Sequence, residues 1–467
     1  MATKQIPGFY FDPVKKKYFR IQADNVAPAG SQYSASAVKK RKVEAERVEH
    51  EQRIQERVRK ERVVKAKCLA NSHSRLLTEI GSSCAPGFVM KSEQSGVFAV
   101  HLQRYEVLKF DKHPNDLKTV MDFARQDSTG IAVMGGNRLA GSGIIACPPV
   151  ASNGDRWSYD IDNASIHYNI PHELSSVTLG ERGHFVATLH GDVSGQSFIA
   201  LGRLPEGSID YPWHTERVPR LSQIKDTATL WCSAARPQSD EPMFAIGTSE
   251  GVYTVRSNQA QWHLNRRPFA HGDSMRHGAR KQKRSSDTLA IEWLGPNVVA
   301  SGLRNSSINL GDIRSGGQVT RLQHPHSVRQ IRKVDEYRIV VAGYQSLQMY
   351  DLRLPQNGMQ SYPRPERHRQ HTSTKPYLVF DDHHNNSHVQ RIDVNPEMGV
   401  LASVTDQNSV KLHSLVNGKV IPSSMSTHRY PLPIASLRFE NGPYPAGHWQ
   451  SPRIVVSCGR VVEEWTC

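Results

Sequence analysis

A short pattern that recurs through most of the chain constrains the fold more than any other feature. Each copy starts with an apolar run that contains Ala, Ser or Gly, continues through a polar turn and ends in alternating apolar and polar residues. This order predicts an antiparallel β-hairpin whose first strand is rich in small residues. The clear copies lie at residues 185–192, 243–255, 298–310, 339–350, 400–412 and 454–465.

Another alternating segment lies ahead of most copies and predicts a third strand. These segments lie at 174–179, 229–233, 289–294, 328–334, 389–394 and 434–439, so the unit repeats at about 40 to 60 residues. Three strands with a variable fourth are typical of a β-propeller blade, and the alternative is a pair of irregular β-sandwich sheets. A weaker unit at about 117–148 raises the number of blades to seven. We therefore predict an all-β fold, a seven-bladed β-propeller over residues 87–467.

The last copy of the pattern predicts how the ring closes. Residues 461–465 lie where the third strand of the seventh blade would finish. A closed ring has no free sheet edge at its seam, so the fourth strand of this blade must come from upstream of the first blade. The alternating segment at 96–102 is the best candidate for that strand.

Two insertions interrupt the blades, and we predict that both are solvated loops. Residues 266–286 are basic and poor in apolar side chains, whereas residues 355–386 are rich in Pro, His, Gln and Arg. The second insertion and the residues after it contain three histidines beside two aspartates, which we interpret as hydrated polar residues rather than a metal site. These residues are Asp381, Asp382, His383, His384 and His388.

The positive charge of the chain is concentrated in an N-terminal arm. Lys and Arg number 59 against 44 acidic residues in the whole chain, a net charge of +15. Residues 34–70 contain no Gly or Pro and place Glu49 four residues before Arg53, which predicts a solvated basic helix. The run Lys39, Lys40, Arg41 and Lys42 is similar to a nuclear import signal, so we predict a nuclear protein, with a cytoplasmic pool left open.

Several classes of protein are disfavoured by what the sequence lacks. No apolar run reaches the roughly 18 to 20 residues of a membrane span, and the first residues do not form a secretory signal. The six cysteines have no Cys-x-x-Cys spacing, which favours free thiols in a reducing compartment over disulfides or zinc. No phosphate-binding loop, zinc-protease or nucleophile-elbow motif occurs. We predict a protein that is not an enzyme and needs neither metal nor cofactor.

The ends of the predicted third strands resemble those of the WD-repeat family. In that family the third strand ends in Trp-Asp; here Tyr350-Asp351 and Gly311-Asp312 keep the aspartate, and Trp465 keeps only the tryptophan. The resemblance implies that Asp406 and Asn305, which lie at turn positions, have structural roles.

Two neighbouring repeats carry a further motif, Asp-x-Arg. Asp312 precedes Arg314 and Asp351 precedes Arg353, with the two arginines 39 residues apart. This resembles the Trp-Asp-x-Arg box of WD-repeat substrate receptors for cullin-4 RING ubiquitin ligases. The resemblance implies that both arginines lie on one rim and bind the ligase adaptor, the damaged-DNA-binding protein. The competing interpretation is that the aspartate caps the strand and the arginine merely follows it.

The two boxes are not equivalent in sequence. Tyr350 gives the second box an aromatic residue, whereas Gly311 stands where the family has Trp or Tyr. We therefore expect Tyr350 to support Arg353 at the adaptor-binding surface, and we expect Arg314 to contribute less.

The N-terminus narrows the resemblance. Residues 6–20 are aromatic and are similar to the opening motif of the cullin-4-associated factor four group. The predicted organisation is an aromatic motif and linker at 1–33, a basic helix at 34–70 and degenerate WD blades at 87–467. The implied function is a non-catalytic subunit that links an unknown protein substrate to the ligase. The alternative, motivated by the basic arm, is a nuclear WD-repeat scaffold associated with nucleic acid or chromatin.

Overall fold

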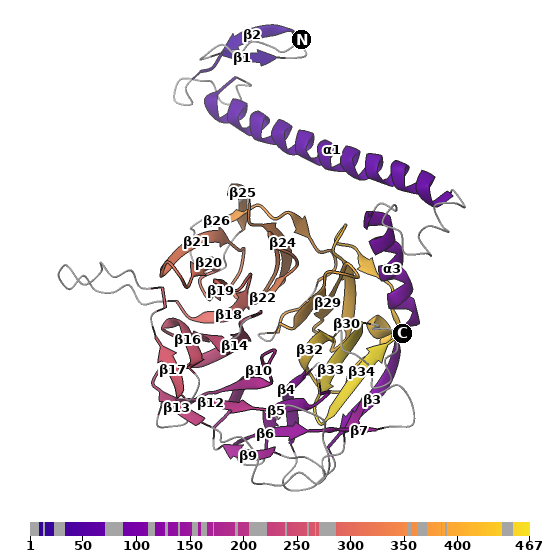
Figure 1. The fold of residues 1–467 in the computed structure, drawn as a ribbon. Coiled ribbons are helices and arrows are strands. Elements are labelled where there is room, and N and C mark those ends of the chain that lie inside the picture. Colours follow the sequence, from indigo (N-terminus) through magenta and orange to yellow (C-terminus); the bar gives the residue numbers. More distant parts are fainter. Residues whose placement is uncertain are drawn as a thin grey trace, which may run out of the picture. The chain divides into compact units, whose positions relative to one another are not determined.

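The structure is a computed structural model whose described residues fall into two compact units, residues 1–90 and 91–467 (Figure 1). Each unit is considered by itself. The described residues are 9–12, 15–22, 33–70, 87–110, 117–126, 129–138, 141–151, 157–159, 166–170, 172–191, 195–204, 222–238, 241–258, 261–266, 268–269, 286–353, 357–362, 371–383, 385–387, 390–440 and 452–467.

The N-terminal unit opens with a small aromatic hairpin. Strand β1 (Phe9–Asp12) pairs antiparallel with β2 (Lys17–Arg20). Asp12 is buried and accepts a hydrogen bond of 2.9 Å from the Tyr33 hydroxyl, and the Tyr33 ring stacks on Phe19 with 4.3 Å between centroids. The aromatic residues of this motif therefore join the hairpin to Tyr33, two residues before the long helix begins.

The long helix α1 (Ala35–Ala70) follows and confirms the helix predicted from the sequence. Arg53 donates a hydrogen bond of 2.7 Å to Glu49, the i,i+4 pair expected on a solvated helical face. Val43, Val48 and Ile54 are exposed, so the described apolar side chains of α1 form no buried stripe.

The second unit is a ring of seven four-stranded antiparallel sheets, which confirms the predicted propeller (Figure 1). Blades 1 to 3 consist of β4 (Thr119–Arg125), β5 (Ala132–Asn137), β6 (Ser142–Cys147) and β9 (Ile166–Ile170); β10 (Leu174–Leu179), β11 (His184–Leu189), β12 (Ser197–Arg203) and β13 (Ser222–Asp226); and β14 (Leu230–Ala235), β15 (Met243–Thr248), β16 (Gly251–Asn258) and β17 (Gln261–Asn265).

Blades 4 to 7 follow the same plan. They consist of β18 (Thr288–Trp293), β19 (Val298–Leu303), β20 (Ser307–Asp312) and β21 (Gly317–Gln323); β22 (Val328–Lys333), β23 (Arg338–Gly343), β24 (Ser346–Asp351) and β27 (Leu378–Val379); β28 (Ile392–Asn395), β29 (Val400–Val404), β30 (Val410–Ser414) and β31 (Val420–Ile421); and β32 (Ile434–Glu440), β33 (Arg453–Cys458), β34 (Val461–Thr466) and β3 (Gln103–Lys109). The short helix α4 (Ser424–Thr427) precedes the last blade.

Small residues occupy the second strand of each blade because this strand packs against the first strand of the next blade. At Gly302 a Cβ atom would overlap the side chain of Val328. The neighbouring Ala300 and Ile308 are buried in one core with Ile331 from the next blade. The repeated apolar pattern therefore forms a core between each pair of blades, as close packing requires.

Closure of the ring occurs by the predicted mechanism but with a different strand. β3 pairs antiparallel with β34, from Gln103 opposite Thr466 to Lys109 opposite Val461. The segment 96–102, predicted to be the closing strand, belongs almost entirely to the helix α3 (Gly87–His101), so that prediction is wrong.

The burial pattern of this segment explains the error. Phe98, Ala99 and Leu102 are buried, whereas Val97 and Val100 are exposed, which is a helical spacing. Over so few residues, strand alternation and one turn of an amphipathic helix give similar sequence patterns.

The insertion at 355–386 is not simply a solvated loop. It forms the hairpin β25 (Asn357–Tyr362) and β26 (His371–Thr374) and then supplies β27, the fourth strand of blade 5. His383 and Asn385 near its end are buried, and Asn385 donates a hydrogen bond of 2.9 Å to the carbonyl of Val404. A second small hairpin, β7 (Pro149–Ala151) and β8 (Trp157–Tyr159), lies between β6 and β9.

Some sequence predictions fall on residues that are not described. His384 and His388 lie outside the described residues, as does most of the basic insertion at 266–286. Among the residues that are described, no group of His, Cys, Asp or Glu side chains is arranged to hold a metal ion. A search of the same residues finds no helix with the length and hydropathy of a membrane span.

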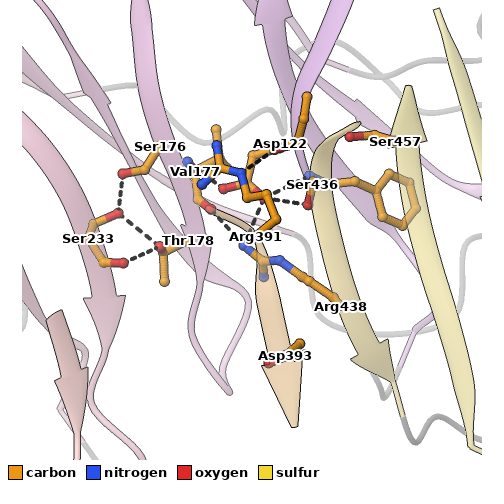
Figure 2. A network of polar contacts seen from close by, with 12 residues as sticks. Asp122, Ser176, Val177, Thr178, Ser233, Arg391, Asp393, Ser436, Arg438 and Ser457 are labelled. Carbon is orange, nitrogen blue, oxygen red and sulfur yellow. Dashed lines mark hydrogen bonds and ion pairs between the residues drawn. The ribbon is translucent and has the colours of Figure 1, made fainter. Parts of the chain in front are cut away.

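Charged side chains on the first strands join the blades around the centre of the ring. Arg332 of blade 5 pairs with Asp393 of blade 6 at 2.8 Å and with Glu292 of blade 4 at 3.4 Å. Arg438 of blade 7 pairs with Asp122 of blade 1 at 2.9 Å, which links the last blade to the first (Figure 2). These ion pairs link blades that are neighbours in the ring.

Candidate protein-docking site

The two Asp-x-Arg boxes fold into the same local structure. Asp312 is the last residue of β20, and its Oδ1 accepts hydrogen bonds from the backbone N–H of Arg314 at 2.9 Å and from Arg314 Nε at 3.2 Å. Arg314 Nη2 donates to Asp312 Oδ2 at 2.8 Å. The carboxylate therefore caps the end of the strand and also fixes the orientation of the guanidinium.

Blade 5 repeats this geometry within 0.1 Å. Asp351 accepts from the backbone N–H of Arg353 at 2.9 Å, from Nε at 3.1 Å and from Nη2 at 2.7 Å. The side chains of Arg314 and Arg353 are 69% and 57% exposed. Capping and docking are thus compatible, because the aspartate orients an arginine whose guanidinium remains accessible.

Electrostatics keep both pairs ionised near neutral pH. Hydrogen bonds from the Arg314 side chain and backbone lower the pKa of Asp312 to about 2. The Arg353 side chain likewise lowers the pKa of Asp351. Exposed pairs of this kind contribute little to folding. Their main consequence is that each arginine is held in one orientation before any partner arrives.

Both boxes lie on the same face of the propeller. The backbone N–H of Ile313 donates to the carbonyl of Asn297 at 2.9 Å, and that of Leu352 donates to the carbonyl of Tyr337 at 2.7 Å. Asn297 and Tyr337 belong to the turns between the first and second strands of blades 4 and 5. We call this surface, formed by these turns and the two boxes, the docking face.

Tyr350 does not lie on the docking face, contrary to the sequence interpretation. It is 1% exposed, and its hydroxyl contacts His324 Nδ1 at 2.8 Å and donates to Gln348 Oε1 at 2.7 Å. Successive side chains of a strand point to opposite sides, so Tyr350 enters the blade core where Asp351 reaches the surface. Tyr350 is a structural residue.

The aromatic residue that supports Arg353 is Tyr337. The Arg353 guanidinium carbon lies 4.7 Å from the centroid of the Tyr337 ring, which is 46% exposed. Sequence reasoning missed it because it belongs to a turn 16 positions before Arg353. The signal that could have found it is an aromatic residue in the turn between the first and second strands of the same blade, because this turn lies next to the end of the third strand.

A second cation–π pair extends the surface on blade 5. Arg338 pairs with Asp335 at 2.6 Å and lies 5.9 Å from the ring of Tyr377, which is 45% exposed. Exposed Tyr and Arg side chains are the residue types most often found in interface hot spots. We call Tyr337, Arg338, Arg353 and Tyr377 the blade 5 corner.

The glycine of the first box has a structural explanation. A Cβ atom at Gly311 would lie 2.5 Å from the ring of Phe269, a residue supplied by the insertion at 266–286. The place of the missing aromatic side chain is therefore filled from another segment. At the position equivalent to Tyr337, blade 4 has Asn297, whose side chain accepts a hydrogen bond of 3.1 Å from Arg236. Among the described residues, no aromatic ring stacks on Arg314.

The basic run of the N-terminal unit is exposed. Lys39, Lys40, Arg41 and Lys42 lie in the first half of α1, and all four are exposed.

Comparison with solved structures identifies the fold. The β-propeller domain of Cps50 (Swd1) from Myceliophteria thermophila aligns with a TM-score of 0.50 at 9% identity, covering 78% of this chain and all of that domain. The WD40 β-propeller domain of Doa1 aligns with a TM-score of 0.46 at 12% identity, covering 78% of this chain and 97% of that domain. The fold is a seven-bladed β-propeller. No protein-family model matches the sequence, and comparison with curated proteins finds no match.

Proposed function

We propose that this protein is a substrate receptor that binds the adaptor of a cullin-4 RING ubiquitin ligase, the damaged-DNA-binding protein, through its docking face. The coarser part of this proposal is that the propeller is a scaffold for contacts between proteins. The observation that supports the specific role is the pair of equally oriented, exposed arginines, Arg314 and Arg353, on adjacent blades.

The geometry suits recognition of an acidic surface. In each box the aspartate uses the Nε and Nη2 donors of the guanidinium, and an arginine carries further N–H donors that a partner can bind. Because the aspartate already fixes the side chain, less conformational entropy is lost on binding. A partner that contacts both arginines must carry acidic groups whose spacing matches the distance between the two boxes. This requirement makes binding specific for such a partner.

The decisive experiment replaces both arginines. We expect R314A/R353A to lose adaptor binding by about 30-fold or more, as for hot-spot arginines, with little change in melting temperature. Lysine at both positions should restore binding only in part, because the charge returns without the planar fork. Co-purification with the adaptor measures the effect.

A matched control comes from the same face of the ring. Arg182 is exposed in the turn between the first two strands of blade 2, so R182A should bind the adaptor as the wild type does. Wild-type levels of adaptor bound to the double-alanine protein would refute the proposal. Failure of that protein to fold would show that the boxes act only as strand caps.

Nuclear import by Lys39, Lys40, Arg41 and Lys42 is part of the same proposal. The support is their exposure on α1. Replacing all four by alanine should move a fluorescent fusion to the cytoplasm, and an unchanged distribution would refute the signal.

The exposed basic helix also supports a second candidate function, a nuclear scaffold that binds nucleic acid or chromatin. That function predicts that affinity for DNA or RNA falls steeply with salt, and that the same four substitutions reduce the slope. A salt-independent or undetectable affinity would eliminate it.

A further inference from the structure

The face opposite the docking face carries a ring of side chains that are placed by β-bulges. In six blades the pairing between the first and second strands shifts near the start of the first strand, at its third residue in blade 1 and at its second residue in the other five. A bulge leaves one residue unpaired and redirects its side chain. The residues at these bulges are Met121, Ser175, Trp231, Leu289, Arg329 and Ala435. Because first and third strands run in the same direction, these positions are remote from Arg314 and Arg353.

We call Trp231, Arg304 and Arg329 the Trp231 cluster. Arg329 follows Val328, whose side chain lies against Gly302, two residues before Arg304. The guanidinium carbon of Arg304 lies 5.6 Å from the centroid of the Trp231 ring, and His190 meets the same ring edge-on at 5.3 Å. Arg304 also pairs with Asp287 at 2.7 Å. Arg304 is therefore held in place by an aromatic ring and a carboxylate.

Arg329 differs from Arg304 in having no counter-ion. Its side chain is half-buried, and no carboxylate among the described residues lies within ion-pair distance of it. Burial lowers the pKa of Arg329, and the positive charge of Arg304 lowers it further. A group whose charged form is disfavoured by its surroundings gains free energy when an anion binds beside it.

We propose that the Trp231 cluster binds a carboxylate side chain of an acidic peptide segment, with Arg329 as the residue that recognises the charge. That this peptide belongs to a ligase substrate rests on the proposed function, whereas the binding itself does not. Arg304 and Arg329 lie on adjacent segments of blades 4 and 5, and among the described residues only Arg304 has a carboxylate partner, so the cluster has room for one further negative charge.

The arrangement favours a peptide over a nucleic acid. Single-stranded nucleic acids bind by stacking bases on exposed aromatic rings and by tracking a basic groove. Here Arg304 and His190 already contact the ring of Trp231, so it offers no free platform for a base.

The test measures binding of a fluorescein-labelled oligoglutamate peptide to the full chain by fluorescence anisotropy, with an oligoglutamine peptide as the uncharged probe. All proteins carry Gln at positions 39, 40, 41 and 42, which removes the main basic run of the arm. We expect the oligoglutamate peptide to bind more tightly than the oligoglutamine peptide, and R329Q to weaken it about 10-fold. R329K should retain most of the affinity.

R182Q is the matched control, because it removes the same charge from an exposed turn outside both the Trp231 cluster and the two boxes, and it should leave oligoglutamate binding unchanged. Equal binding by R329Q and the parent protein would overturn the proposal, as would equal losses in R329Q and R182Q. Tighter binding of an oligothymidine that also depends on Arg329 would assign the cluster to nucleic acid instead. Because the adaptor is absent, none of these outcomes depends on adaptor docking.

Discussion

Arginine–carboxylate pairs occur in two regions of this propeller, and their surroundings give them different consequences. At the seam between blades 7 and 1, Arg125 lies 3.2 Å from Glu440 and 3.1 Å from Glu464, and its side chain is 3% exposed. On the docking face, Arg314 and Arg353 make pairs of similar length but are 69% and 57% exposed. The same chemistry is buried in one region and hydrated in the other.

The buried seam contains two charges of each sign. Arg453, 1% exposed, lies 3.8 Å from Glu440 and 3.7 Å from Glu464, so each arginine faces both acids. Burial raises the pKa of Glu440, and Arg125 and Arg453 counteract this effect. Removing one member leaves an uncompensated buried charge, which costs far more than losing an exposed pair. The comparison thus predicts that the seam determines stability and the docking face determines binding.

The largest effect should come from removing the strand that carries the seam. Deletion of residues 460–467 eliminates β34, which pairs with both β33 and β3. We expect this protein to lose its cooperative thermal transition, because two sheet edges are left unpaired. Deletion of Cys467 alone, an exposed residue beyond the strand, is the control and should melt as the wild type does. A cooperative transition in the larger deletion would contradict the prediction.

A single substitution in each region should distinguish the buried seam from the docking face, with a smaller loss of stability than the deletion causes. E464Q leaves Arg125 and Arg453 with one acid, and we expect it to reduce the free energy of unfolding by about 3–5 kcal/mol. D312N, the equivalent change on the docking face, should leave urea unfolding almost unchanged because that pair is exposed. Similar losses in the two variants would show that burial does not distinguish the regions.

The pH dependence of stability should also differ in sign between buried and exposed acids. Burial raises the pKa of Glu292 to about 6, so its contribution to stability is complete below its ordinary pKa and is lost as the pH rises through about 6. Relative to the wild type, E292Q should therefore gain free energy of unfolding, by at most about 2 kcal/mol, as the pH rises from 4 to 7.

The partly exposed Asp312 provides the opposite case. Its pKa is lowered to about 2, so its contribution is present above the ordinary pKa and is lost as the pH falls. The small difference between D312N and the wild type should therefore be complete above about pH 4 and should disappear as the pH falls toward 2. Urea titrations over this pH range measure both variants, and parallel profiles would contradict the assignment.

The smallest expected effect is on adaptor binding, and it comes from removing the aromatic side chain of Tyr337 that contacts Arg353. Y337A should weaken adaptor binding about 2- to 5-fold, the size expected for an exposed cation–π contact, without lowering the melting temperature. Y344A is the control, because Tyr344 is equally exposed but lies in a turn on the opposite face. A larger loss in R314A than in R353A would contradict the importance given to the blade 5 corner.

The sequence predicted the elements whose patterns extend over many residues. The seven blades follow from a repeated period, and the helix α1 follows from a long stretch free of Gly and Pro. Predictions that relied on a short segment or on composition alone were wrong in two places. Residues 96–102 were expected to form a strand but form the end of α3, and the insertion at 355–386 contains three strands. Short alternating patterns do not distinguish one helical turn from a strand.

On the docking face, too, some contacts could be predicted from the sequence and others could not. The sequence by itself determined the two boxes, since the hydrogen bonds from Arg314 to Asp312 span only two positions. Only the tertiary structure decided that Tyr337 rather than Tyr350 stacks on Arg353, and that Phe269 fills the space beside Gly311. Contacts within a turn are fixed by local backbone geometry, whereas contacts between turns depend on which segments the packed blades bring together.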